Sequence, residues 1–391
     1  MSFAANQART FLRLVATLRA RWHTDQALPA AIQKLLSSEK AFGSRDRRLY
    51  RELIYTTIRH LPWIEPLLDA QPEEALRRIA WLAADTPATH AFRAEFATGT
   101  PPEGDKAELL PAWFRAHCPE LFSPPELATQ LRRAPLWLRL QTDRPEAVLA
   151  EFETRGWRTR PSPLLPAALE VLDEADVTQS EAWTRGAIEV QDLGSQLLLE
   201  SIGIAPGGRW LDACAGAGGK SLQLGRLLGP KGTVEAYDIR PSALTELQHR
   251  AIRARIQNIR TLPPSTTIAA GAYDGILVDA PCSGSGTWRR SPHLKWATTP
   301  AVIAERAALQ ASLLAQFSAA VRPGGRLVYA TCSLSSEENE SVVAAFLKAH
   351  PDFAPASFAR TFDAIPRDAG LLFLPSRHDT DGFYVASLLR H

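Results

Sequence analysis

The second half of the chain alternates between short apolar runs and helical patterns, and this alternation limits its possible folds. Residues 209–214, 233–237, 275–278 and 326–330 read as buried strands. Helical patterns cover 222–228, 243–255 and 303–321 between and beside them. Strands that alternate with helices in this way form an α/β layer structure with a doubly wound, mostly parallel sheet. We therefore expect one such domain over residues 186–391.

The first half follows two other patterns. Residues 1–125 read as an all-helical domain: Phe11, Leu14 and Leu18 fall at helical spacing, and Ser44 is placed to cap a second amphipathic helix. Residues 126–185 read as a small α/β segment, with a strand over 136–141, a helix over 145–155 and a strand over 169–172. A chain of 391 residues has room for two or three domains.

Charge is distributed unevenly along the chain. The net charge is only +2, but residues 1–60 hold eleven Lys and Arg against four Asp and Glu, an excess of seven positive charges. Such an asymmetry indicates a polyanionic partner, although a solvated helix surface would give the same count. Four cysteines without a CxxC pair, and no long apolar run or secretory signal, indicate a reducing cytoplasmic compartment with no disulfide framework, structural zinc site or membrane partner.

A glycine-rich loop follows the first strand of the α/β domain. It reads Asp212-Ala-Cys-Ala-Gly-Ala-Gly-Gly-Lys-Ser221, and its glycines let the backbone approach a ligand at a helix N-terminus. It is not a P-loop, because Cys214 stands where that motif needs glycine. NAD, FAD and S-adenosylmethionine sites all use such loops. Asp238 ends the second strand, where an acid can accept hydrogen bonds from both ribose hydroxyls.

Two cysteines each follow a predicted strand. Cys282 and Cys332 are 50 residues apart, and the carboxyl ends of strands are where open α/β sheets bind ligands and perform chemistry. The pair indicates either a nucleophile with a helper or a redox couple. A redox couple needs the two sulfurs at bonding distance, which sequence spacing does not show.

Five motifs stand out in the sequence: the segments 186–196, 212–221, 279–287 with 289–296, 331–333 and 381–386. With these motifs the chain resembles a known family, the RNA 5-methylcytosine methyltransferases of the Nol/Nop/Sun (RsmB/NOP) group. The helical N-terminal part further resembles the NusB-like domain of the subgroup called RsmB or Fmu, which methylates 16S ribosomal RNA; residues 44–55 and Arg59 carry that likeness.

The resemblance implies a Rossmann-like class I methyltransferase that transfers a methyl group from S-adenosylmethionine to C5 of a cytosine. Cys332 would attack C6 of the base, Asp279 would bind the pyrimidine edge, and Cys282 would assist product release. The motif has Ala217 where proline is usual, and no acid follows the third strand over 258–266. The implied cofactor-binding residues are Cys214, Ala215, Gly216, Ala217, Gly218, Gly219, Lys220, Asp238 and Asp279.

The same resemblance implies an RNA partner. Arg289, Arg290 and Lys295, with His293 among them, are expected to grip RNA phosphates near a flipped target base. The expected substrate is small-subunit (16S) ribosomal RNA, and the protein is expected to act as a monomer. Two other functions stay open on the residues alone. One is a non-catalytic ribosomal-RNA-binding assembly protein; the other is a DNA cytosine methyltransferase with Cys282 as nucleophile, against which the Thr331-Cys-Ser333 motif argues.

Overall fold

The computed structural model describes residues 2–391 and divides the chain into two compact units. One unit is Met1–Arg133 together with Trp288–Pro300, and the other is Ala134–Thr287 together with Ala301–His391. The helical part thus extends a few residues past the expected boundary at 125. The small α/β segment is not separate, because it belongs to the same compact unit as the methyltransferase-like residues.

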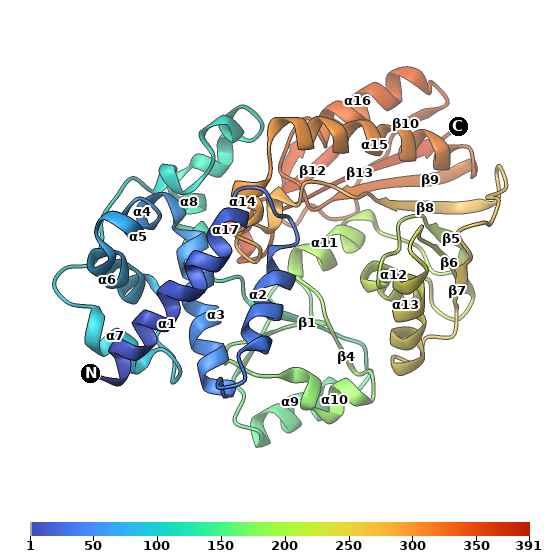
Figure 1. Ribbon diagram of the computed structural model, residues 1–391. Helices are drawn as coiled ribbons and strands as arrows, with labels where there is room; N and C mark the ends of the chain where they lie inside the picture. The colour runs from blue at the N-terminus through green and yellow to red at the C-terminus, as the bar shows by residue number, and fades with distance from the viewer. Residues whose placement is uncertain (1) are drawn as a thin grey trace. The chain divides into compact units, whose positions relative to one another are not determined.

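The helical unit contains no strand among its described residues, as the sequence predicts. Phe11, Leu18, Trp22, Leu53 and Ile58 are fully or almost fully buried in one core. The second amphipathic helix begins at Ser44, but its N-cap is Gly43 rather than Ser44. The elements of the helical unit (Figure 1) are α1 (Phe3–Leu18), η1 (Arg19–Arg21), α2 (Leu28–Ser38), α3 (Ser44–Arg59), α4 (Leu61–Ile64), α5 (Leu67–Ala70), α6 (Pro72–Leu82), α7 (His90–Phe96), η2 (Lys106–Leu109), η3 (Ala112–Ala116), η4 (Pro119–Phe122), α8 (Pro124–Gln130) and α14 (Leu294–Ala297).

A short segment from the second half of the sequence completes this unit. Trp288–Pro300, which contains α14, follows the Cys282 motif in sequence but packs with the N-terminal helices. Trp296 lies against the helical core and donates a hydrogen bond from Nε1 to the Ile58 carbonyl at 2.7 Å. The methyltransferase-like sequence therefore contributes thirteen consecutive residues to the helical unit.

The second unit begins with a four-stranded antiparallel sheet in the order β2-β3-β1-β4. Its core is built from alternate strand residues such as Leu138, Leu169 and Ile188, with Phe152 from the helix between them. The sequence predicts β1, α9 and β3 to within about two residues. The elements are β1 (Leu136–Leu140), α9 (Pro145–Thr154), β2 (Thr159–Pro161), β3 (Ala168–Val171), η5 (Val177–Gln179), α10 (Glu181–Thr184) and β4 (Ile188–Val190).

The larger sheet of this unit has nine strands in the order β11-β12-β13-β9-β8-β5-β6-β7, with β10 beside β13. Strands β7, β6, β5, β8 and β9 are parallel, and the strands beyond β9 are antiparallel. In Figure 1, α11, α12 and α13 cover one face and α15 and α16 the other. The elements are α11 (Leu193–Ile202), β5 (Gly208–Asp212), α12 (Gly219–Leu228), β6 (Gly232–Tyr237), α13 (Pro241–Arg253), β7 (Ile259–Leu262), β8 (Tyr273–Asp279), η6 (Ser285–Thr287), α15 (Pro300–Ser318), β9 (Val321–Thr331), α16 (Glu340–Ala349), β10 (Phe353–Pro355), β11 (Ile365–Arg367), β12 (Gly370–Phe373), α17 (Pro375–His378) and β13 (Phe383–Arg390).

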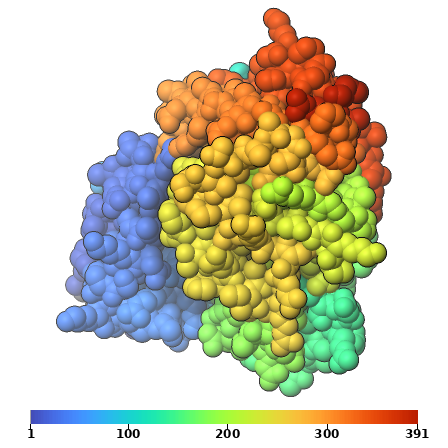
Figure 2. Space-filling view, turned by 90° about the vertical axis from the view of Figure 1, so that its right-hand side faces the viewer, coloured from blue at the N-terminus to red at the C-terminus, as the bar shows by residue number. Residues whose placement is uncertain are grey.

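The register of the parallel strands fixes where the predicted site residues meet. Strands β8 and β9 pair directly, with Asp279 opposite Ala330, so the loops that follow them start side by side. At the other end of the parallel group, β7 is an edge strand; with α13 and the residues around it, coloured yellow to gold, it lies on the face shown in Figure 2. None of the helices formed by residues 2–391 combines the length and apolarity that a membrane span requires.

Candidate active site

The two predicted cysteines lie together at the carboxyl ends of β8 and β9. The distance between Cys282 Sγ and Cys332 Sγ is 3.3 Å, and both side chains are partly exposed. Both thiols are free, and 3.3 Å is a hydrogen-bonding distance for sulfur, well beyond an S–S bond. The expectation that residues 50 apart in sequence form one pair at the sheet edge therefore agrees with the structure.

The surroundings of Cys282 favour the protonated thiol. The hydrogen bond with Cys332, burial, and the negative charges of Cys332 and Glu338 together raise the pKa of Cys282 well above its ordinary value. Cys214, in the glycine-rich loop, is also kept as a thiol, because burial and the carboxylates of Asp212, Asp279 and Asp238 raise its pKa. Neither residue is suited to be a ready nucleophile at neutral pH.

A buried cation stands beside this pair. Lys220 Nζ lies 2.8 Å from Asp279 Oδ2, and the two side chains are 11% and 29% exposed. Burial opposes the ammonium, but the charge and hydrogen bond of Asp279, with the charges of Cys332 and Asp212, raise the pKa of Lys220. Lys220 therefore stays charged. We expected this residue only in the cofactor loop, and the structure places its ammonium on the predicted catalytic acid.

The glycine-rich loop has the shape that its sequence predicts. Gly216 and Gly218 have φ angles of +53° and +89°, which suit glycine, and a Cβ on Gly218 would lie 2.5 Å from Leu247 Cγ. A Cβ on Gly219, at the start of α12, would meet no atom within 4 Å, so the loop faces open space there. At the end of β5, Asp212 accepts a hydrogen bond from Ser221 Oγ at 2.6 Å, and burial raises the pKa of Asp212 to about 7.

Asp238 holds this loop to the end of β6. Its carboxylate accepts hydrogen bonds from the Gly216 N–H at 2.8 Å and from the Arg240 side chain at 3.0 Å. Burial opposes the charge, but these hydrogen bonds outweigh it and lower the pKa of Asp238. The next residue, Ile239, is 76% exposed. A glycine cradle over open space, an ionised acid and an exposed apolar side chain fit an adenosyl ligand with ribose hydroxyls.

Two further motif glycines explain how the loops close around the cysteines. The Gly286 N–H donates to the Cys332 carbonyl at 2.9 Å, and the Gly382 N–H donates to the Gly286 carbonyl at 2.8 Å. A Cβ on Gly286 would lie 2.0 Å from the Gly382 oxygen. The motifs at 279–287, 331–333 and 381–386 thus meet at a point where only glycine fits.

The predicted RNA contacts do not agree with the structure at two of three positions. Arg289 and Lys295 are each only 1% exposed, within the helical unit. Lys295 Nζ donates to the carbonyls of Arg59 and Leu109 at 3.0 Å, and burial lowers its pKa well below the ordinary value. His293 is buried as well, against the Gln26 carbonyl. These side chains hold the 288–300 segment in place and are not available to phosphates. Arg290 is exposed and keeps its predicted role as an expectation.

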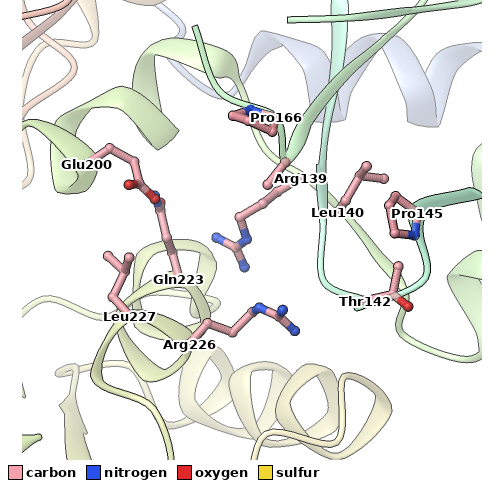
Figure 3. Close-up of a pocket in the computed structure, with 10 residues that line it drawn as sticks. Arg139, Leu140, Thr142, Pro145, Pro166, Glu200, Gln223, Arg226 and Leu227 are labelled. Atoms are coloured by element: carbon pink, nitrogen blue, oxygen red, sulfur yellow. The ribbon is translucent and has the colours of Figure 1, made fainter. Parts of the chain in front are cut away.

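A cavity of this unit lies away from the predicted site residues. It has a volume of about 360 Å³ between β1, α11 and α12, and none of its lining residues is a predicted site residue (Figure 3). Arg139 and Arg226 point into it. Arg139 is buried and donates to the Gly219 carbonyl at 2.9 Å, and burial lowers its pKa to about 9. We interpret the cavity as space around a structural arginine that supports the glycine-rich loop.

Sequence reasoning missed Glu338. It lies six residues after Cys332 in the loop between β9 and α16, and its side chain is fully buried. The only signal was the run Ser335-Ser-Glu-Glu-Asn-Glu340, which reads as an ordinary polar loop and helix start.

Residues 201–389 match the family model described as 16S rRNA methyltransferase RsmB/F. The probable ribosomal RNA small subunit methyltransferase B of Bacillus subtilis is 30% identical over 260 residues, covering 64% of this chain and 58% of that protein. The chain thus aligns with under three fifths of that relative. Ribosomal RNA small subunit methyltransferase B of Yersinia pestis is 28% identical over 93% of this chain and 95% of its own length. The crystal structure of PH0851 superposes with a TM-score of 0.76 at 23% identity, over 99% of both chains.

Proposed function

Residues 201–389 match the model of the 16S rRNA methyltransferase RsmB/F family, and from this match we propose that the chain methylates C5 of a cytosine in small-subunit ribosomal RNA. One observation carries the proposal. Two thiols lie 3.3 Å apart at adjacent strand ends, beside the Lys220–Asp279 ion pair. Methylation at C5 of a pyrimidine needs a nucleophile that adds to the ring and later leaves it, and this pair supplies both a nucleophile and a partner for its release.

The family assignment confirms the expected cofactor, S-adenosylmethionine. When bound, this cofactor supplies an electrophilic methyl group. The residues that would hold it are the loop 214–219, Asp238 for the ribose hydroxyls and Ile239 for an apolar contact. The described third-strand region, β7, offers no acid, so we assign adenine recognition to backbone groups and Ile239.

Cys332 is the proposed nucleophile. Its thiolate adds to C6, forming an S–C6 bond, and the C5=C6 electron pair moves toward C5 and the ring carbonyl system. C5 then has the electron density to attack a methyl group. The Lys220 ammonium, kept charged by Asp279, stabilises the negative charge that passes from the sulfur to the pyrimidine. Asp279 in turn orients Lys220 and can bind the amino edge of cytosine.

Cys282 serves the reverse half of the reaction. After methylation the proton on C5 leaves to a base, the C5=C6 bond reforms, and the S–C6 electron pair returns to Cys332. While Cys332 is bonded to C6, burial and the charge of Glu338 still favour the thiol form of Cys282, because both raise its pKa. At 3.3 Å its S–H can donate a hydrogen bond to the departing Cys332 sulfur. A leaving thiolate with such a donor departs more easily than one without it.

The RNA is proposed to reach this site with help from the helical unit. Three exposed arginines lie in the first half of α3, within the basic N-terminal region: Arg45, Arg48 and Arg51. Exposed arginines suit phosphate contacts that fix position without reading sequence. Together with Arg290, they take the place of the buried Arg289 and Lys295 in the proposed RNA interface.

Bisulfite sequencing tests the reaction and the substrate together. Purified protein is incubated with S-adenosylmethionine and unmodified 16S rRNA, with 23S rRNA and transfer RNA as parallel substrates. We expect a single protected cytosine in 16S rRNA and none with the Cys332→Ala variant. Protection only in another RNA would overturn the substrate and leave the chemistry standing. Methyl incorporation without bisulfite protection would overturn C5 as the target.

A further inference from the structure

One buried carboxylate near the cysteines has no part in the reaction described above. Glu338 follows β9, and its side chain is fully buried between the Cys282 loop, the Cys332 loop and α15. An acid buried this completely costs free energy unless its charge is well solvated by hydrogen bonds. The partners that solvate it therefore show what its charge is used for.

The carboxylate bonds to the residue that follows each cysteine. Oε1 accepts from the Ser283 N–H at 2.8 Å, and Oε2 accepts from Ser283 Oγ and from Ser333 Oγ, both at 2.5 Å. Ser283 follows Cys282, and Ser333 follows Cys332. One side chain thus bridges two loops whose cysteines are 50 residues apart in sequence.

Other bonds fix this bridge in place. Gln310 Nε2, from α15, donates to Glu338 Oε1 at 3.0 Å and to the Pro281 carbonyl at 3.1 Å. Ser285 Oγ lies 3.0 Å from Ser333 Oγ and accepts from the Leu334 N–H at 2.8 Å. The Glu338 carbonyl accepts from Tyr329 OH at 2.5 Å. The network is buried, so each bond acts in a low dielectric and is stronger than it would be in water.

We propose that Glu338 is a positioning residue that holds the Cys282 and Cys332 loops in register and so sets the short distance between their sulfurs. Its carboxylate accepts hydrogen bonds from Ser283, Ser333 and Gln310, so it acts on the cysteines through the serines that follow them. The catalytic meaning of this register rests on the proposed function, whereas the register itself can be measured without it. The negative charge of Glu338 also contributes to the raised pKa of Cys282, which keeps that residue in its thiol form.

A carboxylate is needed here because all four of its contacts are donors: one N–H, two hydroxyls and one amide. Glu338→Gln keeps the size and shape but turns one acceptor oxygen into an NH₂ donor. If that donor faces the Ser283 N–H and Gln310 Nε2, a bond of the bridge is lost; if it faces the two hydroxyls, they must turn and accept instead. In either orientation the charge-assisted bonds become weaker neutral ones. Glu337→Gln, at the partly exposed neighbouring acid, makes the same chemical change outside the bridge and is the matched control.

The register is tested with dibromobimane, a bifunctional reagent that bridges two nearby thiols. We expect Glu338→Gln to slow bridging of Cys282 to Cys332, read by peptide mass spectrometry, by about tenfold or more, the response expected from a shift on the order of 1 Å. Glu337→Gln should bridge at the wild-type rate, and Cys332→Ala should give no bridge. Unchanged bridging in folded Glu338→Gln would overturn the proposal. Should this variant fail to fold, Ser333→Ala, which removes a single hydroxyl of the bridge, takes its place with the same expectations.

Kinetics with ribosomal RNA then separate positioning from a merely structural role. Glu338→Gln is expected to lower kcat by up to about 10²-fold while KM for both substrates stays near wild type. Slowed bridging with an unchanged kcat would overturn the catalytic importance of the register. If wild-type protein methylates no RNA but bridging responds as expected, the proposed function fails and the positioning role of Glu338 stands.

Discussion

The loops after β8 and β9 occupy equivalent positions in the sheet but differ in the charges around their cysteines. Each follows a parallel strand of the same sheet, each carries a cysteine within three residues of the strand end, and the two cysteines are in contact. Glu338 bonds to both loops, but its negative charge contributes to the raised pKa of Cys282, whereas Cys332 interacts with the Lys220 ammonium and contributes to the raised pKa of Lys220. Equivalent positions in a fold therefore do not imply equivalent chemistry. The roles are set by which charge the neighbouring elements deliver.

Removal of the Cys332 thiol should have the largest effect on activity, because it leaves only one of the two cysteines at the site. Cys332→Ala is expected to lower methyl transfer by about 10³-fold or more, because the reaction then lacks its nucleophile. The measurement is incorporation of labelled methyl groups into 16S rRNA. Cys118→Ala, at a buried cysteine in the helical unit, is the matched control and should retain activity. Full activity of Cys332→Ala would reassign the nucleophile to Cys282.

Removal of the Cys282 thiol should impair a different step of the reaction. Cys282→Ala still allows Cys332 to add to the base, but it removes the S–H donor that assists departure of the sulfur. Turnover should fall by roughly 10²-fold, and a covalent protein–RNA adduct should accumulate and run as a shifted band on a denaturing gel. The double variant Cys282→Ala/Cys332→Ala should show no adduct. An adduct that persists in the double variant would mean that a third residue attacks the base.

The Lys220 ammonium is the charge that distinguishes the surroundings of Cys332 from those of Cys282. Lys220→Met keeps the length of the side chain and removes the ammonium, which should lower kcat by about 10²-fold through loss of charge stabilisation. Lys231→Met, at an exposed lysine after α12, is the control. Steady-state kinetics distinguish two roles for Lys220. A higher KM for S-adenosylmethionine with an unchanged kcat would place it in cofactor binding only, as the sequence first indicated.

Most of the fold of the second unit could be predicted from the sequence, because periodicity is local information. The four strands with apolar runs and the helices around them were found to within a few residues, apart from the long strand β9, which begins at Val321. The antiparallel strands at the far edge, β10 to β13, were not predicted; most are short, and their pairing depends on contacts distant in sequence.

Site residues could be predicted from the sequence where they lie in strand-end motifs. The prediction failed where a residue's role depends on whether its side chain is buried. The positions of Cys282, Cys332 and Asp279 at strand ends predict that they lie at one edge of the sheet, and the structure places them there, while their catalytic roles stay a proposal. Arg289 and Lys295 were misjudged, because a basic run after a catalytic loop looks the same in sequence whether it is exposed or packed against other helices. Glu338 was missed for the same reason, since no local pattern shows that a loop acid is buried.

The smallest effect concerns the protonation of Cys282 and isolates the electrostatic difference between the two loops. The pKa of Cys282 is raised, so only a small fraction is thiolate at pH 8.5, and alkylation by iodoacetamide should be slow there and rise with pH to well above 9. In Cys332→Ala the largest cause of the shift, the hydrogen bond that the Cys282 thiol makes to Cys332, is gone, so the pKa of Cys282 should fall toward its ordinary value. The ratio of Cys282 alkylation rates at pH 8.5 and 10.5, measured by peptide mass spectrometry, cancels differences in access. We expect this ratio to increase in Cys332→Ala, because a fall of the pKa toward its ordinary value raises the thiolate fraction more at pH 8.5 than at pH 10.5. An identical ratio in both proteins would mean that burial alone sets the pKa, and the two loops would then differ in packing rather than in charge.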